Sequence, residues 1–213
     1  MTHIAIVAHT SRITQAIQLM GDTNADYITT DDGTLGGKNN HIRAWQWLAD
    51  HHPKDTYSVV LEDDAQPVPN FTHQLALALA KASTDVVSLY LGTGHPRRPQ
   101  PAIAQAIAHA QQHDTCWITA PELHHAVGTA IRTHLITDML NYIDNLNRPI
   151  DQAITSWATR KHQHRTISYT TPSLVDHADQ ATVVISRRRV ASRPRKAWWV
   201  GECDTWTTDS IPL

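Results

Sequence analysis

The chain has 213 residues, of which 41% are hydrophobic and 18% charged, and its formal net charge is −2. This composition is typical of a soluble globular protein of one domain. No apolar run approaches the ~20 residues that cross a bilayer, and no basic-then-apolar leader opens the chain, so we expect neither a membrane span nor a secretory signal. The two cysteines, Cys116 and Cys203, make no disulfide framework. We therefore expect a reducing cytoplasm, with free thiols that are core residues or weak ligands.

Short apolar strands alternate with helical patterns along the first half of the chain, and the second half continues the alternation less regularly. Strands that alternate with helices of this size predict an α/β domain, with a mostly parallel sheet covered by helices on both faces. The predicted strands are 3–9, 25–30, 57–61, 85–91, 115–119, 126–131 and 165–170. The predicted helices run from 12 to about 20, from 38 to about 49, from 70 to about 82, after 101, and over 133–142 and 151–161.

Three consecutive acids, Glu62, Asp63 and Asp64, directly follow the strand predicted over 57–61 and precede a loop broken by prolines. In an extended segment the first and third side chains point one way and the second points the other way. Carboxylates this close repel one another unless a cation joins them, and oxygen ligands suit Mg²⁺ or Mn²⁺. Open α/β sheets bind ligands at the carboxyl ends of their strands, so we expect a divalent metal held against a diphosphate here. The alternative is a solvated acidic loop.

The acid run belongs to the sequence LEDDAQPVPNF, which resembles the acid motif of metal-dependent glycosyltransferases with the GT-A fold. The resemblance is strongest to family 25 enzymes of the lipopolysaccharide-biosynthesis type and to small phage-encoded relatives. Further blocks resemble those proteins in the same order, namely GGKNNHIRAWQWL, SLYLG, HHAVGTAIRT, RPIDQAI and PSLVDHAD. The resemblance implies a GT-A-like, Rossmann-like single domain over residues 1–186. Residues 187–213 form a basic, Trp-rich segment that packs on this domain or extends from it.

The resemblance also implies roles for the three acids and for a late histidine. In this family the last acid of the triplet binds Mn²⁺ or Mg²⁺, and the first contacts the ribose or the metal, which places these roles on Asp64 and Glu62. A late histidine often completes the metal shell, and His177 matches it. Asp63 either contacts the nucleotide or braces the loop. The metal bridges the two phosphates and neutralises the charge of the departing nucleoside diphosphate.

Nucleotide contacts are expected from residues that follow the first two strands and the glycine-rich loop 33–37. A helix amino terminus favours phosphate or uracil oxygens, and an acid after the second strand can accept a hydrogen bond from the base or the ribose. Capping and turn chemistry explain Ser, Thr, Asp and Asn at such positions without a ligand. The candidates are Thr10, Ser11, Arg12, Asp31, Asp32, Lys38 and Asn39.

The candidate general base is Asp151. An inverting transfer needs a group that takes the proton of the acceptor hydroxyl, and the resembled family places an acid in this block. Asp138 and Asp144 are alternatives, and Asp151 also suits a helix cap. His124 and His125 are candidates for lining the acceptor cleft, or for a structural role.

The residues and the resemblance thus predict a metal-dependent glycosyltransferase of hexosyltransferase type that moves a sugar from a nucleotide donor, such as a UDP-sugar, to a hydroxyl. Inversion is implied by the resemblance alone. The acceptor is a glycan, a phage structural protein or hydroxymethylated DNA, and a phage-encoded enzyme would act in the host cytoplasm.

Two alternatives remain open. A nucleotidyltransferase also uses strand-end acids and Mg²⁺, although the segment AHTSRIT lacks the glycine of a phosphate loop. A nucleic-acid-binding module would use the six basic residues of 187–196 together with Trp198 and Trp199.

Overall fold

The computed structural model describes residues 2–161, 163–179 and 195–213. Its strands are β1 (Thr2–His9), β2 (Tyr27–Asp31), β3 (Tyr57–Glu62), β4 (Ala65–Pro67), β5 (Val86–Ser88), β6 (Trp117–Ala120), β7 (Gly128–Arg132), β8 (Ile167–Thr170), β9 (Val175–His177) and β10 (Ile211–Pro212). Its α-helices are α1 (Ile13–Thr23), α2 (Gly37–His51), α3 (Phe71–Lys81), α4 (Gln100–Gln112), α5 (Ile136–Ile143) and α6 (Ile150–Ala158), with 3-10 turns η1 (Thr10–Arg12) and η2 (Thr133–Leu135). Within these ranges, no helix is long and apolar enough to cross a membrane.

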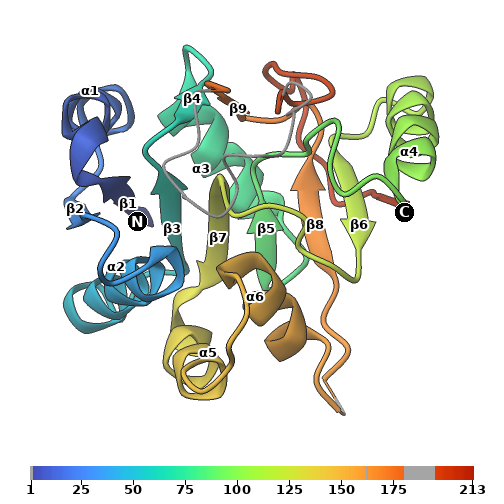
Figure 1. The fold of residues 1–213 in the computed structure, drawn as a ribbon. Coiled ribbons are helices and arrows are strands. Elements are labelled where there is room, and N and C mark those ends of the chain that lie inside the picture. The colour runs from blue at the N-terminus through green and yellow to red at the C-terminus, as the bar shows by residue number, and fades with distance from the viewer. Residues whose placement is uncertain (1, 162, 180–194) are drawn as a thin grey trace.

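Eight strands form one mixed sheet in the order β10-β6-β8-β5-β7-β3-β1-β2, and β4 pairs with β9 in a separate two-stranded ribbon (Figure 1). β1 lies between β2 and β3 and is parallel to both, whereas β7 is antiparallel to its neighbours β3 and β5. Of the seven strand pairings in the described part of the large sheet, four are parallel. The carboxyl ends of β1, β2 and β3 therefore meet at one edge, called the carboxyl edge below.

The two faces of the sheet carry separate apolar cores, because successive side chains of a strand point to opposite sides. In β1, Ala5 and Val7 pack into one core, and Ile4 and Ile6 pack into the other. Helices α2, α4, α5 and α6 cover the first face, and α1 and α3 cover the second. Figure 1 shows α5 and α6 in front of the sheet and α3 behind it. The prediction of helices on both faces is confirmed.

The C-terminal residues 195–213 pack on the body of the domain. β10 extends the sheet beside β6, and Trp206 packs against Trp117 in the second core. Cys116 and Cys203 form a disulfide. The expectation of free thiols is therefore wrong, because folding brings two cysteines that are 87 residues apart in the chain to a Cα–Cα distance of 6.2 Å. A cytoplasmic location stays a prediction, and the boundary expected after residue 186 falls in 180–194, outside the described residues.

Some elements differ from the sequence-based prediction. β4 and β9 have three residues each and β10 has two, which is too short for an alternation to be recognised. The strand expected over 85–91 is paired only over Val86–Ser88. At Leu89 the amide still donates to Gly128 of β7. The carbonyl of Leu89 instead accepts from the amides of Leu174 and Val175, so here the chain turns from the sheet to the segment that carries β9.

Candidate functional site

The acid run lies where β3 ends, at the carboxyl edge. Glu62 is the last residue of β3 and follows Val60 on the face covered by α2, whereas Asp63 follows Leu61 on the opposite face. Oε1 of Glu62 lies 3.2 Å from Nε2 of His41, a buried residue of α2. The alternation of the strand therefore separates the first two carboxylates.

Asp63 holds the loop after β3 against the end of β1. One of its carboxylate oxygens accepts a hydrogen bond from the amide of His9 at 2.7 Å, and the other accepts one from the guanidinium of Arg12 at 2.9 Å. Its own amide donates to the carbonyl of Val7 at 3.0 Å. These contacts brace the loop, and a nucleotide contact by Asp63 stays a prediction.

Asp64 and His177 approach each other at the β4–β9 ribbon. His177 is the last residue of β9 and lies opposite Ala65 of β4, and its Nε2 is 3.5 Å from Oδ2 of Asp64. The same oxygen accepts a hydrogen bond from Arg12 at 2.8 Å. The other oxygen, Oδ1, is buried and has no hydrogen-bond partner in the described part of the chain. The ribbon thus brings His177 next to Asp64, although these two predicted metal ligands lie far apart in the sequence.

Arg12 supplies a buried positive charge to two of the acids. Its side chain donates to both Asp63 and Asp64, and all three residues are buried. Burial acts to lower the pKa of Arg12, but the bonds to the two carboxylates outweigh burial and raise it. The guanidinium predicted to contact the nucleotide is therefore engaged with the acid run, and its nucleotide role stays a prediction.

The pKa values of Asp64, Glu62 and His177 are not all shifted in the same direction. Burial raises the pKa of Asp64, and the charge of Glu62 adds to this effect. For Glu62, burial acts in the same direction, but the hydrogen bond and the charge of His41 outweigh it and lower the pKa. Burial also lowers the pKa of His177, although Asp64 opposes that shift. A cation beside Asp64 would favour its charged form.

The residues at this corner fit a divalent cation by their chemistry. Carboxylates suit Mn²⁺ and Mg²⁺, and imidazole is a common metal ligand, so Glu62, Asp64 and His177 form an acceptable donor set. The buried Oδ1 of Asp64 could bind a cation without the loss of a hydrogen bond to the described residues.

Two features of Glu62, Asp64 and His177 differ from the geometry that metal binding requires. Nδ1 of His177 accepts a hydrogen bond from the amide of Asp179 at 2.8 Å, so the proton of a neutral ring lies on Nε2 and points to Asp64. The ligand atoms of Glu62, Asp64 and His177 also do not all lie within 4.8 Å of one another. Binding a metal through Nε2 therefore requires the other tautomer of His177 and a closer approach of the three side chains.

A cavity of about 370 Å³ opens beside the ends of β1 and β2. Thr10, Asp31 and Asp32 line it, together with Arg43 of α2. The two oxygens of Asp31 each accept a hydrogen bond from an amide of the following loop, at 2.9 Å. Asp32 accepts hydrogen bonds from the hydroxyl and amide of Thr34, which lower its pKa. Both carboxylates therefore stabilise the turn that follows β2, which is the structural alternative named from the sequence. They also line the cavity.

Ser11 lies next to this cavity without lining it. Its hydroxyl is 2.7 Å from Nδ1 of His9, and its amide donates to the same nitrogen. His9 therefore caps the turn η1 by accepting from the amide of Ser11, and a nucleotide contact by Ser11 stays a prediction.

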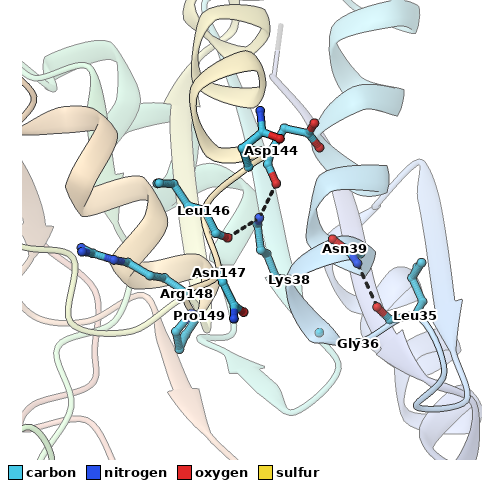
Figure 2. A pocket seen from close by; sticks show the side chains of 11 residues that line it. Leu35, Gly36, Lys38, Asn39, Asp144, Leu146, Asn147, Arg148 and Pro149 are labelled. Carbon is cyan, nitrogen blue, oxygen red and sulfur yellow. Dashed lines mark hydrogen bonds between the residues drawn. The ribbon is translucent and has the colours of Figure 1, made fainter.

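A second cavity, of about 530 Å³, lies between the start of α2 and the loop that joins α5 to α6 (Figure 2). Lys38 and Asn39 line it, and Leu35 borders both cavities. Nζ of Lys38 donates to the carbonyl oxygens of Asp144 and Leu146, as Figure 2 shows. The lysine expected to bind the diphosphate therefore fastens this loop to α2 in the structure.

Asp151 lies in the first turn of α6, and the helix cap is Pro149. The alternative role of Asp151 as the cap is therefore wrong, because the chain enters the helix two residues earlier. Oδ1 of Asp151 accepts a hydrogen bond from the amide of Gln152. The next turn packs on the loop before β7, where the hydroxyl of Thr155 accepts a hydrogen bond from the amide of Leu123. Asp151 thus comes close to the loop that carries both predicted acceptor-site histidines.

His124 and His125 lie in this loop, with their Nε2 atoms buried and without a hydrogen-bond partner in the described residues. Burial lowers the pKa of both, and that of His125 to about 4. His125 packs edge-on against Tyr90, with ring centroids 5.2 Å apart. Burial thus favours the neutral form of both imidazoles, and their contact with an acceptor stays a prediction.

Asp138, the alternative candidate for the base, accepts hydrogen bonds from the indole of Trp157 and from the guanidinium of Arg160.

Three residues near the site escaped the sequence-based prediction. His41 follows the helical spacing of Trp45 and Leu48, and a histidine on this apolar face was the signal that could have indicated its buried role. Arg43 lines the smaller cavity, and no pattern in the sequence distinguishes it from other surface arginines. Tyr90 lies beside two site histidines at centroid distances of 5.2 and 6.3 Å, and no pattern in the sequence marks it.

The basic C-terminal segment lies largely in 180–194, outside the described residues. Its last two cations are described and pair with acids next to His177. Nε of Arg195 lies 3.4 Å from Asp179, and Nζ of Lys196 lies 3.2 Å from Asp176. The predicted use of this segment for nucleic-acid binding stays a prediction.

No protein-family model and no curated protein sequence matches the chain. Among solved structures, A197 from STIV aligns with 82% of this chain and 85% of its own length, at 12% identity and a TM-score of 0.46. A glycosyltransferase involved in the glycosylation of the major capsid of PBCV-1 aligns with 75% of each chain, at 10% identity and a TM-score of 0.34. The function assigned to this chain therefore rests on the residues of its own site.

The fold class expected from the sequence is the one observed. The chain forms a mixed α/β domain with an eight-stranded, mostly parallel sheet between two layers of helices. Such sheets bind ligands at their carboxyl edge, which is where the acid run and the cavity of Asp31 lie.

Proposed function

We propose that this chain is a metal-dependent glycosyltransferase that moves a sugar from a nucleotide donor, a UDP-sugar, to an acceptor hydroxyl with inversion. The observation that carries the proposal is the approach of His177 to Asp64 at the carboxyl edge, where Glu62 ends β3, with one oxygen of Asp64 buried and unpartnered in the described residues. A set of acids at this edge is suited to a ligand that brings positive charge and phosphate together.

The donor lies along the carboxyl edge in this proposal. The cavity of Thr10, Asp31 and Arg43 accepts the nucleoside, since it offers hydroxyl, carboxylate and guanidinium groups to a base and a ribose. Asp64, with Glu62 and His177, holds Mn²⁺ or Mg²⁺ next to the diphosphate. When bound there, the ion neutralises charge on the leaving nucleoside diphosphate. Arg12 balances negative charge through its ion pairs with Asp63 and Asp64.

The acceptor approaches from the side of Asp151. Its carboxylate takes the proton of the attacking hydroxyl, and the first turn of α6 holds that carboxylate in place through the amide of Gln152. His124 and His125 border the acceptor from the loop before β7. The acceptor hydroxyl belongs to a glycan, a phage structural protein or hydroxymethylated DNA.

A cytoplasmic site of action belongs to the same proposal, in the host cell if the chain is phage-encoded. The disulfide between Cys116 and Cys203 is the feature that speaks against it, because disulfides persist mainly in oxidising compartments. Determining the thiol content of protein isolated under alkylating conditions decides between the two.

Thermal unfolding with UDP and Mn²⁺ tests the donor site. Ligand at about a hundredfold Kd should raise the Tm of the wild-type chain by about 5–10 °C. Asp64→Asn should lose this shift, because the substitution removes the charge with little change of shape. Asp50→Asn, which alters an exposed acid of α2, should keep it. If neither UDP nor GDP shifts the wild-type Tm in the presence of metal, the proposal fails.

Turnover with a panel of UDP-sugars and hydroxyl acceptors tests the base. Asp151→Asn should keep the UDP–Mn²⁺ shift and lose about 10²–10⁴-fold in transfer rate. Asp144→Asn is the matched control, since the contact of this residue with Lys38 uses only its backbone carbonyl. A loss confined to Asp144→Asn would assign the base there instead. Release of pyrophosphate in place of UDP would identify the nucleotidyltransferase alternative.

A further inference from the structure

Two histidines and an aspartate gather at the end of the sheet opposite the acid run. His3 is the second residue of β1, Asp26 directly precedes β2, and His52 follows the last residue of α2. One ligand atom from each lies within 4.8 Å of the other two, the single such group of His, Cys, Asp and Glu in the described residues. In the β1–β3 register His3 pairs with Ser58 and Val7 with Glu62, so about 13 Å of strand separates the two clusters.

Backbone hydrogen bonds and ring stacking hold the three residues near one another. Oδ2 of Asp26 accepts a hydrogen bond from the amide of Ile4 at 3.0 Å, and the amide of Asp26 donates to the carbonyl of Ile4 at 2.8 Å. The amide of His52 donates to the carbonyl of Leu48, which continues the hydrogen bonding of α2. The ring of His52 stacks on the ring of His3, with centroids 3.5 Å apart. The three donors therefore come from three chain segments that the fold holds together.

Asp55 fixes the tautomer of His3. One carboxylate oxygen of Asp55 contacts both the amide and Nδ1 of His3. A carboxylate accepts hydrogen bonds, so Nδ1 carries the proton of a neutral ring and Nε2 keeps its lone pair. This is the arrangement in which a histidine ligates a metal while a carboxylate orients it from behind.

We propose that His3, Asp26 and His52 form a zinc site at this end of the sheet. Ligand atoms on one tetrahedral Zn²⁺ lie about 3.4 Å apart, so atoms that lie within 4.8 Å of one another need to move by at most about 1 Å each. The rings of His3 and His52 are now nearly parallel, at 11°, and the ring of His52 must turn about its Cβ–Cγ bond to aim a nitrogen at the ion. Its position just after α2, at the start of a loop, permits this rotation.

The charges and the donor types favour zinc. Two neutral imidazoles and one carboxylate are the donor set of many three-ligand zinc sites, and Asp26 with Asp55 balances the two positive charges of the ion. The site joins the first strand to the loops before β2 and β3, so bound zinc stabilises the amino-terminal part of the sheet. It is separate from the acid run and does not depend on the transferase proposal.

Zinc titration of the EDTA-treated full chain at neutral pH tests the site. Wild-type protein should bind a zinc ion that His52→Ala and Asp26→Asn both lose, as measured by calorimetry. Zinc at about a hundredfold Kd should raise the wild-type Tm by about 5–10 °C, and this shift should vanish in both variants. Asp26→Asn keeps the acceptor for the amide of Ile4, so it serves if His52→Ala does not fold.

Two control variants separate this site from other zinc binding by a chain with 15 histidines. His51→Ala removes the adjacent histidine, whose Nδ1 contacts the carbonyl of Trp47, and should leave the zinc shift intact. Asp64→Asn should also leave it intact. Equal zinc binding by wild type and both site variants would overturn the proposal, as would loss of the shift in Asp64→Asn in their place.

Discussion

Replacing Arg12 with methionine tests whether the acid run depends on a buried countercharge. The guanidinium is 8% exposed and donates to Asp63 and Asp64 at 2.9 and 2.8 Å. Methionine keeps much of the side-chain volume but removes both ion pairs. Two buried carboxylates then remain beside Glu62 without that charge.

The expected loss follows from the burial of the pair. Removing one partner of a buried ion pair costs about 3–5 kcal/mol, because the other charge stays buried. In a domain of this size each kcal/mol lowers Tm by roughly 2–4 °C, so Arg12→Met should lower Tm by about 10 °C near neutral pH. Arg160→Met is the matched control, because its partner Asp138 is 46% exposed and such pairs contribute about 0–1 kcal/mol.

The loss should depend on pH in a defined direction. The pKa of Asp64 is already raised by burial and by Glu62, and removal of Arg12 raises it further. An acid with a raised folded pKa stabilises the fold fully below its unfolded value of 3.8 and loses that contribution as pH rises through the folded value. The Tm gap between Arg12→Met and wild type should therefore narrow as the solution is made more acidic.

Thermal unfolding followed by circular dichroism, with and without excess Mn²⁺, measures both effects. The cation should recover part of the Tm lost in Arg12→Met, because it replaces the guanidinium as the charge beside Asp64. A change in Tm no larger than that of Arg160→Met would refute the buried-pair argument. A loss of Tm that Mn²⁺ leaves untouched would count against a cation at Asp64.

Three further changes test other parts of the structure. Gly92→Ala should lower the free energy of unfolding in urea by about 1–3 kcal/mol, because its Cβ would lie 2.5 Å from the buried ring of Tyr90. In Gly21→Ala the added Cβ meets open space, so this variant should raise the free energy of unfolding by up to about 1 kcal/mol. A Gly92→Ala variant more stable than Gly21→Ala would contradict this reasoning. Cys203→Ser should lower the unfolding free energy by about 2–5 kcal/mol, and a reductant should lower that of the wild type but leave the variant unchanged if the disulfide is present. Burial lowers the pKa of His125 to about 4, so its contribution to stability is lost as pH falls from 6.5 towards that value. His125→Phe should remove about 3 kcal/mol of this loss at most, and an unchanged acid limb of the stability–pH curve would refute the assignment.

The strands that matter for the site were readable because their signals are local. The apolar runs of β1 and β3 follow from side chains that point to opposite faces, both of which are buried. The acid run had to fall at a strand end because no charge would continue a strand buried on both faces. Its place at the carboxyl edge therefore followed from the sequence.

The partners of the acids could not be read in the same way. Arg12 reaches Asp63 and Asp64 only because β1 and β3 are neighbours in the sheet, and His177 reaches Asp64 only through the three-residue strands β4 and β9. The turn contacts of Asp31 depend on how its loop folds back.

The sequence by itself therefore determined the alternation of strands and helices and the position of the carboxylates at the end of β3. These follow from the spacing of apolar and charged residues within one segment. Tertiary structure alone decided which groups neutralise those carboxylates, that Cys116 bonds Cys203, and that His3 meets His52 at the opposite end of the sheet. Such contacts depend on strand order and loop path, which join residues far apart in the chain and leave no periodic trace in it.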